Sequence, residues 1–585
     1  MSSNAKTPDK FTLINELARR RGFFWQSYEI YGGISGFATY GPLGTKLKQN
    51  IEKKLRDLFV NKIGILEIES PIITPAKVFE ASGHIEHFKE PMVQCQNCKK
   101  WFRADHLLEE IVKIDESDAE KMSLEELKAA LDKNEIHCPD CGGKFGQLKQ
   151  FLTMFETTIG PYSDAVGYGR AEAAQGIFVE FNRLYEMARS KLPFGVLQIG
   201  HALRNEISPR QGLIRLREFT IADLEFFFDP EEPNSTLLKS VANEKLRLLL
   251  ADDKLKGSEK TTDVSAKEAL KKGFIKSEWQ AVFMALAKKL LEELGVPAEK
   301  QRFIEKLPWE RAHYSLQSFD QQVLVERWGW VEVSGHAYRS DYDLKRHMEY
   351  SGADMRVFKE YEKPVETEKT AVKTLMIKLG PAFKNEAAKV AELLSNADPG
   401  EVDAALKKKG FYMLGKHKIL PEHVQIVRQK ITESGKRFVP HVVEPSFGSD
   451  RLFYVALEYA YREKEERALL SFPRDIAPIQ LGIYPLVSKD GIAEKALQVY
   501  AKLLSEGFTA EFDDAGSIGR RYARADEAGI PLGLTIDYDT LKNDTVTIRD
   551  RDSWKQVRTS IEDLSKHLHG YFSWKSNFED LGKLV

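Results

Sequence analysis

A strand-like run near the middle of the chain carries the strongest chemical signal. With the two-residue period of a β-strand, one face of residues 213–228 presents Arg215, Arg217, Phe219, Asp223 and Glu225. The opposite face is mostly apolar, although Glu218 and Ile221 interrupt the alternation. Arginine forms bidentate hydrogen bonds with phosphate, an aromatic ring stacks on a base, and carboxylates hold an ammonium group. The order of these residues indicates a ligand-binding strand; the alternative is a solvated amphipathic strand with surface ion pairs.

Two C-x-x-C pairs form the second chemical signal. They contain all four cysteines of the chain: Cys95, Cys98, Cys138 and Cys141. Each pair can place two thiolates on one ion, and together they complete a tetrahedral zinc site with no open position for chemistry. The interval between the pairs is longer than usual, but its charged, helical middle can be looped out. The pattern predicts structural zinc; the alternative is a set of redox pairs or buried free thiols.

Length and composition exclude several classes of protein. The chain has 585 residues with 86 Lys and Arg against 88 Asp and Glu, a formal net charge of −2. This excludes a chain-wide basic coat but not a local basic patch for nucleic acid. Hydrophobic residues make up 42% and charged residues 30%, which is typical of a globular protein rather than a disordered one. Since no signal peptide and no long apolar run is visible, we expect no membrane span and a cytoplasmic location.

The elements that must position these residues can be read from the hydrophobic periodicity. Up to residue 230 the pattern predicts a helix at 43–60, a strand at 65–68 ending at Pro71, helices within 104–136, and strand-like material at 151–228. Beyond it the pattern predicts helices at 231–305, a strand at 328–333, short helices and turns at 356–436, and a strand running into a helix at 438–463. The middle of the chain therefore reads as one strand-rich core interrupted by charged helical insertions.

After Pro473 the pattern changes to a regular alternation. Strands are predicted at 479–487, 508–512, 532–537 and 545–549, and helices at 491–506, 518–528 and 555–569. Such alternation is typical of a separate α/β domain. Arg520, Arg521 and Arg524 lie near the start of one of its helices, where they suit phosphates and splayed bases of RNA; the alternative is a solvated helix face.

Three segments resemble the signature motifs of class II aminoacyl-tRNA synthetases. Residues 204–219, with RNE before a loop and RLREF after it, resemble motif 2. Residues 443–451 (VEPSFGSDR) resemble motif 3, and residues 43–71 resemble motif 1. Within the class the chain is most similar to the dimeric glycyl-tRNA synthetases, through residues 27–33 (SYEIYGG), 82–84 (SGH), 170–178 (RAEAAQGIF), 329–332 (GWVE) and 339–344 (RSDYDL). The resemblance runs from about residue 10 to the C-terminus and is weakest in the insertions.

The resemblance implies an α/β (α+β) fold and a division into domains. It implies an antiparallel-sheet catalytic core of the class II type with helical insertions, followed by a C-terminal α/β anticodon-binding domain. The core would comprise residues 1–92, 151–230, 306–355 and 438–477. The zinc-binding insertion would occupy 93–150, further insertions 231–305 and 356–437, and the anticodon-binding domain 478–585.

The same resemblance implies the activity and the partners. Members of the family use ATP and Mg²⁺ to convert glycine to glycyl-adenylate and then transfer glycine to the 3′ end of tRNA(Gly). Their motif 1 pairs across a two-fold axis, so a homodimer is expected. Two alternatives stay open: a sister class II synthetase for another small amino acid, and a non-catalytic nucleic-acid-binding relative. The second would be expected to lose the ATP-binding arginines, which this chain keeps.

The resemblance assigns an ATP site in which Arg204, Glu206 and Arg451 are catalytic. Arg204 would hold the α-phosphate, Glu206 the adenine amino group and Arg451 the γ-phosphate, while Phe219 stacks on adenine. The full implied set is Arg204, Asn205, Glu206, Leu213, Arg215, Leu216, Arg217, Glu218, Phe219, Glu332, Val333, Gly448 and Arg451. Glu332 and Glu444 would lie on the Mg²⁺ side of ATP. A structural carboxylate at Glu332 and a helix-face ion pair at Arg451 are the alternatives.

For the amino acid, the resemblance implies a small pocket that works by exclusion, because glycine has no side chain to bind. The implied set is Arg103, Glu172, Phe219, Asp223, Arg339, Glu444, Ser446 and Gly448. Within it, Glu172, Asp223 and Ser446 would bind the ammonium group. The chain departs from the family pattern at three positions: Ala171 replaces proline, Ala173 replaces threonine, and Asp223 stands where glutamate is usual. These departures loosen the ammonium site or shift its role to Glu225.

Overall fold

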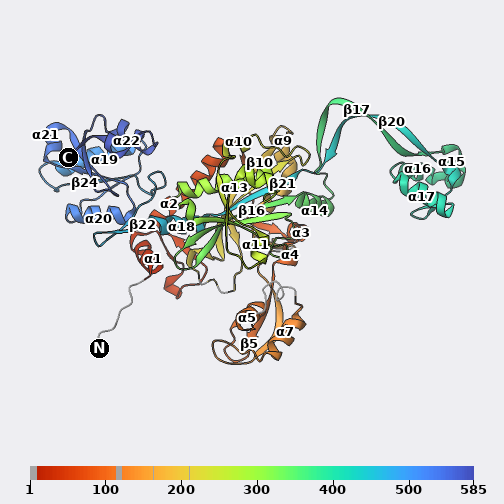
Figure 1. Cartoon of the computed structure of the whole chain (residues 1–585), viewed down its shortest axis with the longest axis horizontal. Coiled ribbons are helices and arrows are strands. Elements are labelled where there is room, and N and C mark those ends of the chain that lie inside the picture. Colours follow the sequence, from red (N-terminus) through yellow and green to blue (C-terminus); the bar gives the residue numbers. More distant parts are fainter. Residues whose placement is uncertain (1–8, 113–121, 162–163, 208, 210) are drawn as a thin grey trace. The chain divides into compact units, whose positions relative to one another are not determined.

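The computed structural model describes residues 9–112, 122–161, 164–207, 209 and 211–585 (Figure 1). The chain forms two compact units, Met1–Met355 with Pro440–Val585, and Arg356–Val439. Within the described ranges, no helix combines the length and the apolar character that crossing a membrane requires. The cytoplasmic location stays a prediction.

A central sheet organises the first unit. Among the described residues it has nine strands in the order β13-β12-β14-β15-β16-β21-β11-β10-β3. Their bounds are β3 Leu66–Glu67, β10 Phe194–Leu203, β11 Glu218–Phe228, β12 Lys245–Leu249, β13 Thr262–Ser265, β14 Gln301–Glu305, β15 Gln317–Val325, β16 Gly329–Ser340 and β21 His441–Gly448. Neighbours run antiparallel except β3 with β10 and β12 with β14. The predicted antiparallel-sheet core is confirmed.

Helices on the sheet bury the apolar residues that the periodicity singled out. Helix α2 (Pro42–Arg56) buries Leu47, Ile51 and Leu55, as its spacing predicts. It continues into a wider turn, Asp57–Lys62, which buries Phe59 against Phe447 at 5.5 Å between ring centroids. Helices α13 (Glu278–Glu293) and α18 (Ser449–Ala460) complete this layer. Helix α18 follows β21 directly, so the predicted strand-to-helix element at 438–463 is confirmed.

Two sequence predictions about this unit are wrong. Residues 231–305 were expected to be helical, but β12, β13 and β14 lie there and widen the sheet beside α10 (Leu238–Val241), α11 (Ala251–Leu255), α12 (Ala266–Lys271) and α13. Strand β12 (KLRLL) alternates charged residues with leucine, while β13 and β14 are short and show no clear period. Residues 151–228 were expected to be strands, but α8 (Ala174–Val179) and α9 (Phe181–Met187) interrupt them. The aromatic composition favours strands, yet Phe181 and Leu184 are buried at helical spacing.

The cysteine-bearing segment forms a small layer of its own. Strands β5 (Lys89–Cys95), β6 (Trp101–Arg103) and β7 (Phe145–Leu152) make one sheet with β5 in the middle. Helices α5 (Ala104–Val112) and α7 (Leu124–Lys133) cover it, and α7 starts with a capping box between Ser123 and Glu126. Residues 113–121 of the predicted helical stretch lie outside the described residues. The two cysteine pairs are thereby brought to the same edge of this layer.

The second unit differs from its prediction of short helices and turns. Two long antiparallel strands, β17 (Val357–Thr374) and β20 (Val424–Phe438), form a ribbon. Between them the chain forms α15 (Met376–Phe383), α16 (Ala387–Ser395), α17 (Pro399–Lys409) and the hairpin of β18 (Tyr412–Leu414) and β19 (His417–Ile419). Of its described residues, the ribbon contributes only Val372, Val424 and Ile426 to the small core of this unit. Most of its length is rich in Lys and Glu and lacks the apolar period that reveals a strand.

The C-terminal part confirms the predicted α/β domain. Its sheet has the order β25-β24-β26-β27-β28-β29, which ends at the short strand β29 (Lys583–Leu584). Strand β24 (Leu481–Pro485) runs parallel to β25 (Ala510–Phe512) and β26 (Leu532–Ile536). Helices α19 (Ile492–Ser505) and α20 (Ile518–Ala528) agree with the prediction. The helix predicted at 555–569 is wrong at its start: Gln556–Ser560 is strand β28, which pairs with β27 (Thr545–Asp550) and buries Val557. Helix α22 begins at Leu564.

Candidate active site

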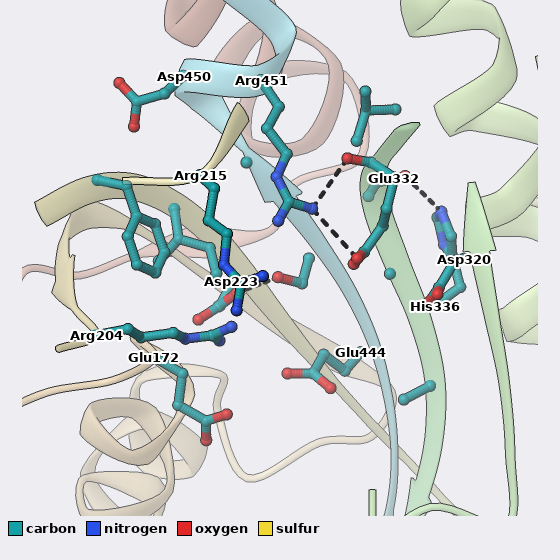
Figure 2. Close-up of a pocket in the computed structure, with 18 of the residues that line it drawn as sticks. Glu172, Arg204, Arg215, Asp223, Asp320, Glu332, His336, Glu444, Asp450 and Arg451 are labelled. Atoms are coloured by element: carbon teal, nitrogen blue, oxygen red, sulfur yellow. Dashed lines mark hydrogen bonds and ion pairs between the residues drawn. The ribbon is translucent and has the colours of Figure 1, made fainter. Parts of the chain in front are cut away.

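One cavity of about 300 Å³ opens over strands β11, β16 and β21 of the central sheet (Figure 2). It brings together most of the predicted site residues: Glu172, Arg204, Glu206, Leu213, Arg215, Leu216, Phe219, Asp223, Glu332, Val333, Glu444, Ser446, Gly448 and Arg451. Residues from four separate stretches of sequence therefore meet at one place. The predicted residues outside its lining are Arg103, Asn205, Arg217, Glu218 and Arg339.

Two arginines that line this cavity are held by backbone carbonyls. Arg451 lies in the first turn of α18, and its Nη1 donates to the carbonyl of Glu332 at 2.9 Å. The same nitrogen is 3.2 Å from the Glu332 carboxylate. Arg204 donates through Nε to the carbonyl of Ala171 at 3.1 Å, and its guanidinium lies 5.3 Å from the centroid of the Phe219 ring. These contacts hold the cations in place, which is what binding of a phosphate chain requires.

Glu206 is already paired in this structure. Arg215 donates through Nε to the Glu206 carboxylate at 2.7 Å. Arg217 supports the backbone behind them: its Nε donates to the carbonyl of Glu206 at 2.9 Å and its Nη1 to the carbonyl of Ser35 at 2.7 Å. Arg217 thus holds the loop rather than facing the cavity. The strand face predicted from alternation is correct for Phe219 and Asp223 but does not extend to Arg217.

Acidic residues that the sequence did not reveal lie beside Glu332. Asp320 on β15 is 3.1 Å from Nζ of Lys306, and both line the cavity. Burial, reinforced by the neighbouring Glu332, raises the pKa of Asp320 to about 7. Burial acts in the same direction on Glu332, but Arg451 and Lys306 outweigh it and hold the pKa of Glu332 below its usual range. The strand at 317–325 was not predicted, so its inward-facing aspartate had no signal.

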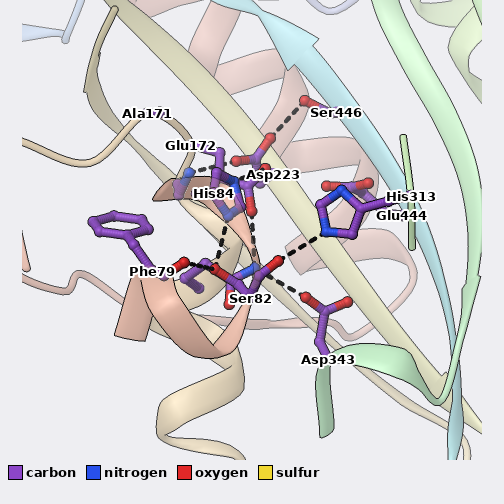
Figure 3. Close-up of polar contacts among 12 residues, drawn as sticks. Phe79, Ser82, His84, Ala171, Glu172, Asp223, His313, Asp343, Glu444 and Ser446 are labelled. Carbon is purple, nitrogen blue, oxygen red and sulfur yellow. Dashed lines mark hydrogen bonds and ion pairs between the residues drawn. The ribbon is translucent and has the colours of Figure 1, made fainter. Parts of the chain in front are cut away.

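Asp223 and Ser446 line the cavity and contact each other (Figure 3). They are paired residues on the neighbouring strands β11 and β21, and Ser446 Oγ donates to Asp223 Oδ1 at 2.5 Å. The backbone N–H of Ala173 donates to Asp223 Oδ2 at 2.6 Å. Burial, reinforced by Glu172, raises the pKa of Asp223. Both carboxylate oxygens are held, so this side chain has a fixed position.

Glu172 also lines the cavity, and side chains outside the lining hold its carboxylate. His84 Nε2 lies 3.3 Å from Glu172 Oε2, and Gln175 Nε2 donates to Glu172 Oε1 at 2.9 Å. Ser82 Oγ is 2.7 Å from Nδ1 of His84 (Figure 3). Burial raises the pKa of Glu172, but His84 and Arg339 outweigh it and keep the pKa well below its usual range. Glu172 is therefore an ionised carboxylate facing the cavity.

Arg339 lies fully buried beneath the carboxylates rather than in the lining. Its Nε donates to Asp343 at 2.8 Å and its Nη1 donates to Glu444 at 2.8 Å. Burial raises the pKa of Glu444 to about 8 even with this arginine beside it. Glu225 is 4.0 Å from Arg339; neither of its oxygens has a hydrogen-bond partner, and burial raises its pKa well above the usual range. Burial thus disfavours a second negative charge on Glu225.

Arg103 does not line the central cavity. It pairs with Asp105 and with Glu90, the latter at 3.0 Å, and it lines a separate cavity beside Trp101 and His106. That cavity shares Arg215 with the central one. The structure thus does not bring Arg103 to the other predicted glycine-binding residues.

The four cysteines meet as a cluster. Sγ of Cys95 is 3.5 Å from Sγ of Cys141, and Sγ of Cys98 is 3.7 Å from Sγ of Cys138. All four sulfur atoms lie within 4.8 Å of one another. Tetrahedral zinc with bonds of about 2.3 Å requires sulfur atoms about 3.8 Å apart. The cluster fits this ion.

The predicted RNA-facing arginines of α20 differ in role. Arg521 is buried and donates to the carbonyls of Asp514 at 2.6 Å and Gly516 at 2.7 Å, so it holds the loop before the helix. Arg524 pairs with Asp513 at 2.8 Å. Arg520 is exposed. Of the three, Arg520 alone keeps the position expected of a residue that contacts RNA.

Comparisons with known proteins agree with this architecture. Residues 480–570 match the anticodon binding domain family. The chain is 48% identical over 582 residues to the glycine–tRNA ligase of Aeropyrum pernix, covering 99% of both chains. It is 46% identical over 566 residues to that of Pyrococcus horikoshii, covering 96% of this chain and 98% of the relative. It is 44% identical over 571 residues to that of Methanocaldococcus jannaschii, with the same coverage.

Solved structures with much lower identity share the fold. Prolyl-tRNA synthetase of Giardia lamblia, in complex with prolyl-adenylate, superposes with a TM-score of 0.52 at 13% identity, covering 95% of this chain and 74% of that one. The enzyme of Cryptosporidium parvum, complexed with halofuginone and AMPPNP, gives 0.52 at 12% identity, with 97% and 77% covered. The class II core with its anticodon-binding domain is thereby confirmed as the fold.

Proposed function

The chain belongs to the glycine–tRNA ligase family, and we propose that its central cavity is where glycine reacts with ATP before transfer to tRNA. The protein is an aminoacyl-tRNA synthetase whose substrates are glycine and tRNA. The observation that carries the assignment of the site is that arginines and carboxylates share one cavity. Arg451 pairs with Glu332 there, and Arg204 is bonded to the carbonyl of Ala171, next to Glu172 in the sequence.

The arginines of the cavity suit the activation of glycine by ATP. Attack of the glycine carboxylate on the α-phosphorus of ATP builds negative charge on the phosphate oxygens and expels pyrophosphate. Arg204 and Arg451, which are held by backbone carbonyls, are placed to stabilise that charge without rearranging. Phe219, beside Arg204, offers a ring face for adenine. Glu206 would meet the adenine amino group once Arg215 turns towards a phosphate.

The family uses ATP with Mg²⁺, and the carboxylates beside Arg451 fit a magnesium ion. When bound, Mg²⁺ neutralises charge on the phosphates. Glu332, one of the two predicted ligands, lines the cavity together with Asp320. Glu444, the other predicted ligand, accepts from Arg339 beside the glycine pocket. We therefore infer Asp320 as the partner of Glu332.

The carboxylates of Glu172 and Asp223 suit the ammonium group of glycine. Glu172 and Asp223 supply negative charge, and Ser446 supplies a hydroxyl beside them. These side chains are buried or nearly so and fixed by hydrogen bonds, so they leave little room for an amino-acid side chain. This supports selection of glycine by exclusion.

Two further features of the proposal concern stability and assembly. Cys95, Cys98, Cys138 and Cys141 would hold one structural Zn²⁺ that fixes the small layer around them. A homodimer through residues 43–71 is proposed from the motif 1 resemblance. Sedimentation at micromolar concentration tests it, and a monomer there would contradict it.

ATP–pyrophosphate exchange with glycine, alanine, serine and proline tests the assignment of the activity. We expect exchange with glycine alone at a substantial rate. The sister-synthetase alternative requires another amino acid to be preferred. The non-catalytic alternative requires no exchange with any of the four.

A further inference from the structure

A third cavity, of about 330 Å³, lies where the catalytic core meets the anticodon-binding domain. Its walls come from the residues after α13, the end of α18, and the connecting residues 471–474. The C-terminal domain adds the residues after β27 and the end of α22 with Trp574 beyond it. The cavity has no lining residue in common with the central cavity. The activation chemistry therefore leaves this cavity unexplained.

The lining of this cavity is positively charged. Among the described residues, its charged side chains are Arg462, Arg474, Arg551 and Asp552. Arg551 and Asp552 neutralise each other, with Nε to Oδ1 at 2.9 Å and Nη2 to Oδ2 at 2.8 Å. Arg551 also donates to the carbonyls of Gly529 at 2.9 Å and Phe472 at 2.8 Å, so it is fully occupied. The unbalanced charge belongs to Arg462 and Arg474.

Among the charged residues that line this cavity, Arg474 has the most unusual environment. Its exposed fraction is 8%, yet within the described part of the chain no carboxylate lies at ion-pair distance from it. Its Nη1 donates to the carbonyl of Ser576 at 3.2 Å, and its Nε has no hydrogen-bond partner. The guanidinium is held 4.1 Å from the ring centroid of Tyr571 and 3.8 Å from that of Trp574. The two rings keep it in place but do not neutralise it.

A buried cation without a counter-charge is costly, and two ring faces offset only part of that cost. A guanidinium fixed by stacking presents its N–H groups in one plane, the geometry that binds phosphate oxygens in pairs. Trp574 is 61% exposed, so the outer part of its ring is free to stack on a base. Charge, fixed geometry and an aromatic face all point to the same kind of ligand.

We propose that this interdomain cavity binds a phosphate group of a nucleic acid or nucleotide, held by Arg474 with Arg462 and flanked by Trp574. The phosphate comes either from the backbone of the bound tRNA or from a free phosphate compound. The tRNA source rests on the proposed function; the free source does not. A role of Arg474 in folding alone, as a clasp between the linker and α22, is the competing explanation.

The test compares variants of the full-length chain at one position. Arg474→Gln removes the charge but keeps a donor for the Ser576 carbonyl, and Arg474→Lys keeps the charge. Arg467→Gln is the matched control, because Arg467 is exposed, stacks on Trp554 at 5.8 Å and does not line the cavity. Glycine-dependent ATP–pyrophosphate exchange needs no tRNA. It should be unchanged in all three variants.

The first arm measures filter binding of a tRNA(Gly) transcript over a range of salt. If a tRNA phosphate occupies the site, Arg474→Gln weakens binding about tenfold or more. It also reduces the slope of log K against log salt by about 0.7 to 0.9, the contribution of one phosphate contact. Arg474→Lys should stay within about threefold of wild type, since it keeps the attraction to one phosphate.

The second arm measures thermal unfolding with added inorganic phosphate. If the source is free phosphate, phosphate raises the melting temperature of wild type and Arg474→Lys more than that of Arg474→Gln, while tRNA binding is equal in all. If Arg474→Gln differs from wild type in neither arm, the proposal is overturned and the clasp explanation stands. Loss of exchange in wild type itself would contradict the proposed function without touching this site.

A second variant guards against a folding defect in Arg474→Gln. Trp574→Ala removes an exposed ring and leaves Arg474 in place. We expect it to weaken binding of the same tRNA about fivefold or more, because a stacked base contributes at least that much. Equal tRNA binding by this variant and wild type, with no difference in the phosphate arm, would also overturn the proposal.

Discussion

His84 Nε2 lies 3.3 Å from Oε2 of Glu172, behind the wall of the proposed ammonium pocket. His84 is in turn held by Ser82, whose Oγ is 2.7 Å from Nδ1. Neither Ser82 nor His84 lines the central cavity. His84 is thus a positioning residue, which acts on glycine through Glu172 rather than by contact.

Replacement of His84 by alanine should therefore affect glycine more than ATP. Without its partner, the Glu172 carboxylate is left buried with fewer contacts and a less defined position. We expect KM for glycine to rise about tenfold in pyrophosphate exchange, with KM for ATP nearly unchanged. Asparagine at this position restores a donor and should recover part of the loss. An equal rise in both KM values would mean that His84 merely supports the fold.

Arg204→Ala should nearly abolish adenylate formation while the protein stays folded. The side chain reaches from the end of β10 into the cavity and is held at the carbonyl of Ala171. Removal of one preorganised charge contact costs about 10² to 10³ in rate. Single-turnover adenylate formation measures this directly, and circular dichroism monitors the fold. Exchange near the wild-type rate would refute the assignment.

The sulfur cluster should contain one zinc ion per chain. Sulfur separations of 3.5 and 3.7 Å match tetrahedral coordination and not a disulfide. We expect elemental analysis of protein purified without chelators to find one equivalent of zinc. Chelation should unfold the layer of β5, β6 and β7 and leave glycine activation largely intact, because that layer lies outside the central cavity. Metal-free protein with unchanged stability would rule the site out.

His336 should make stability depend on pH. Burial lowers its pKa to about 3 from the ordinary 6.5, so the folded protein holds it neutral while the unfolded chain protonates it below 6.5. The free energy of unfolding is therefore unaffected by the protonation of His336 above about pH 6.5, and it decreases as the pH falls from 6.5 towards 3. Between about pH 7 and pH 5 the melting temperature of wild type should fall more steeply than that of His336→Gln, by the effect of at most one proton. Parallel curves would contradict this.

The structure brings most of the residues predicted for the site into one cavity, whereas several surrounding strands were missed, for physical reasons. Phe219 and Asp223 were recognisable because residue types alternate along β11, although the strand is buried on both faces from Thr220 to Phe228. Among its described side chains, the ribbon of β17 and β20 buries only a few near its ends, such as Val357, Val372 and Val424, and its strands were missed. The approach of His84 to Glu172 depends on packing between α4 (His84–His87) and the segment before α8, which no local pattern encodes. Asp320 was missed because the strand that turns it inward was missed.

Rejection of alanine is the last prediction. A methyl group contributes only about 1 kcal/mol of binding, or roughly tenfold, so stronger discrimination has to come from a clash. The wall is suited to this: Asp223 is held by Ser446 at 2.5 Å and by the Ala173 N–H at 2.6 Å, and Glu172 is held from behind. Fixed side chains cannot yield to a Cβ without breaking these bonds.

We therefore expect kcat/KM for alanine in pyrophosphate exchange to be lower than for glycine by well over tenfold, and no hydrolysis of misacylated alanyl-tRNA by this chain. Asp223 is the position where the wall could admit a Cβ, because its side chain is one methylene shorter than that of glutamate. Asp223→Glu should narrow the pocket and lower the alanine-to-glycine ratio further, even where it slows both reactions. Ser446→Gly, which removes one support and a Cβ, should raise that ratio. A wild-type enzyme that activates alanine within about tenfold of glycine would show that exclusion by clash does not operate here.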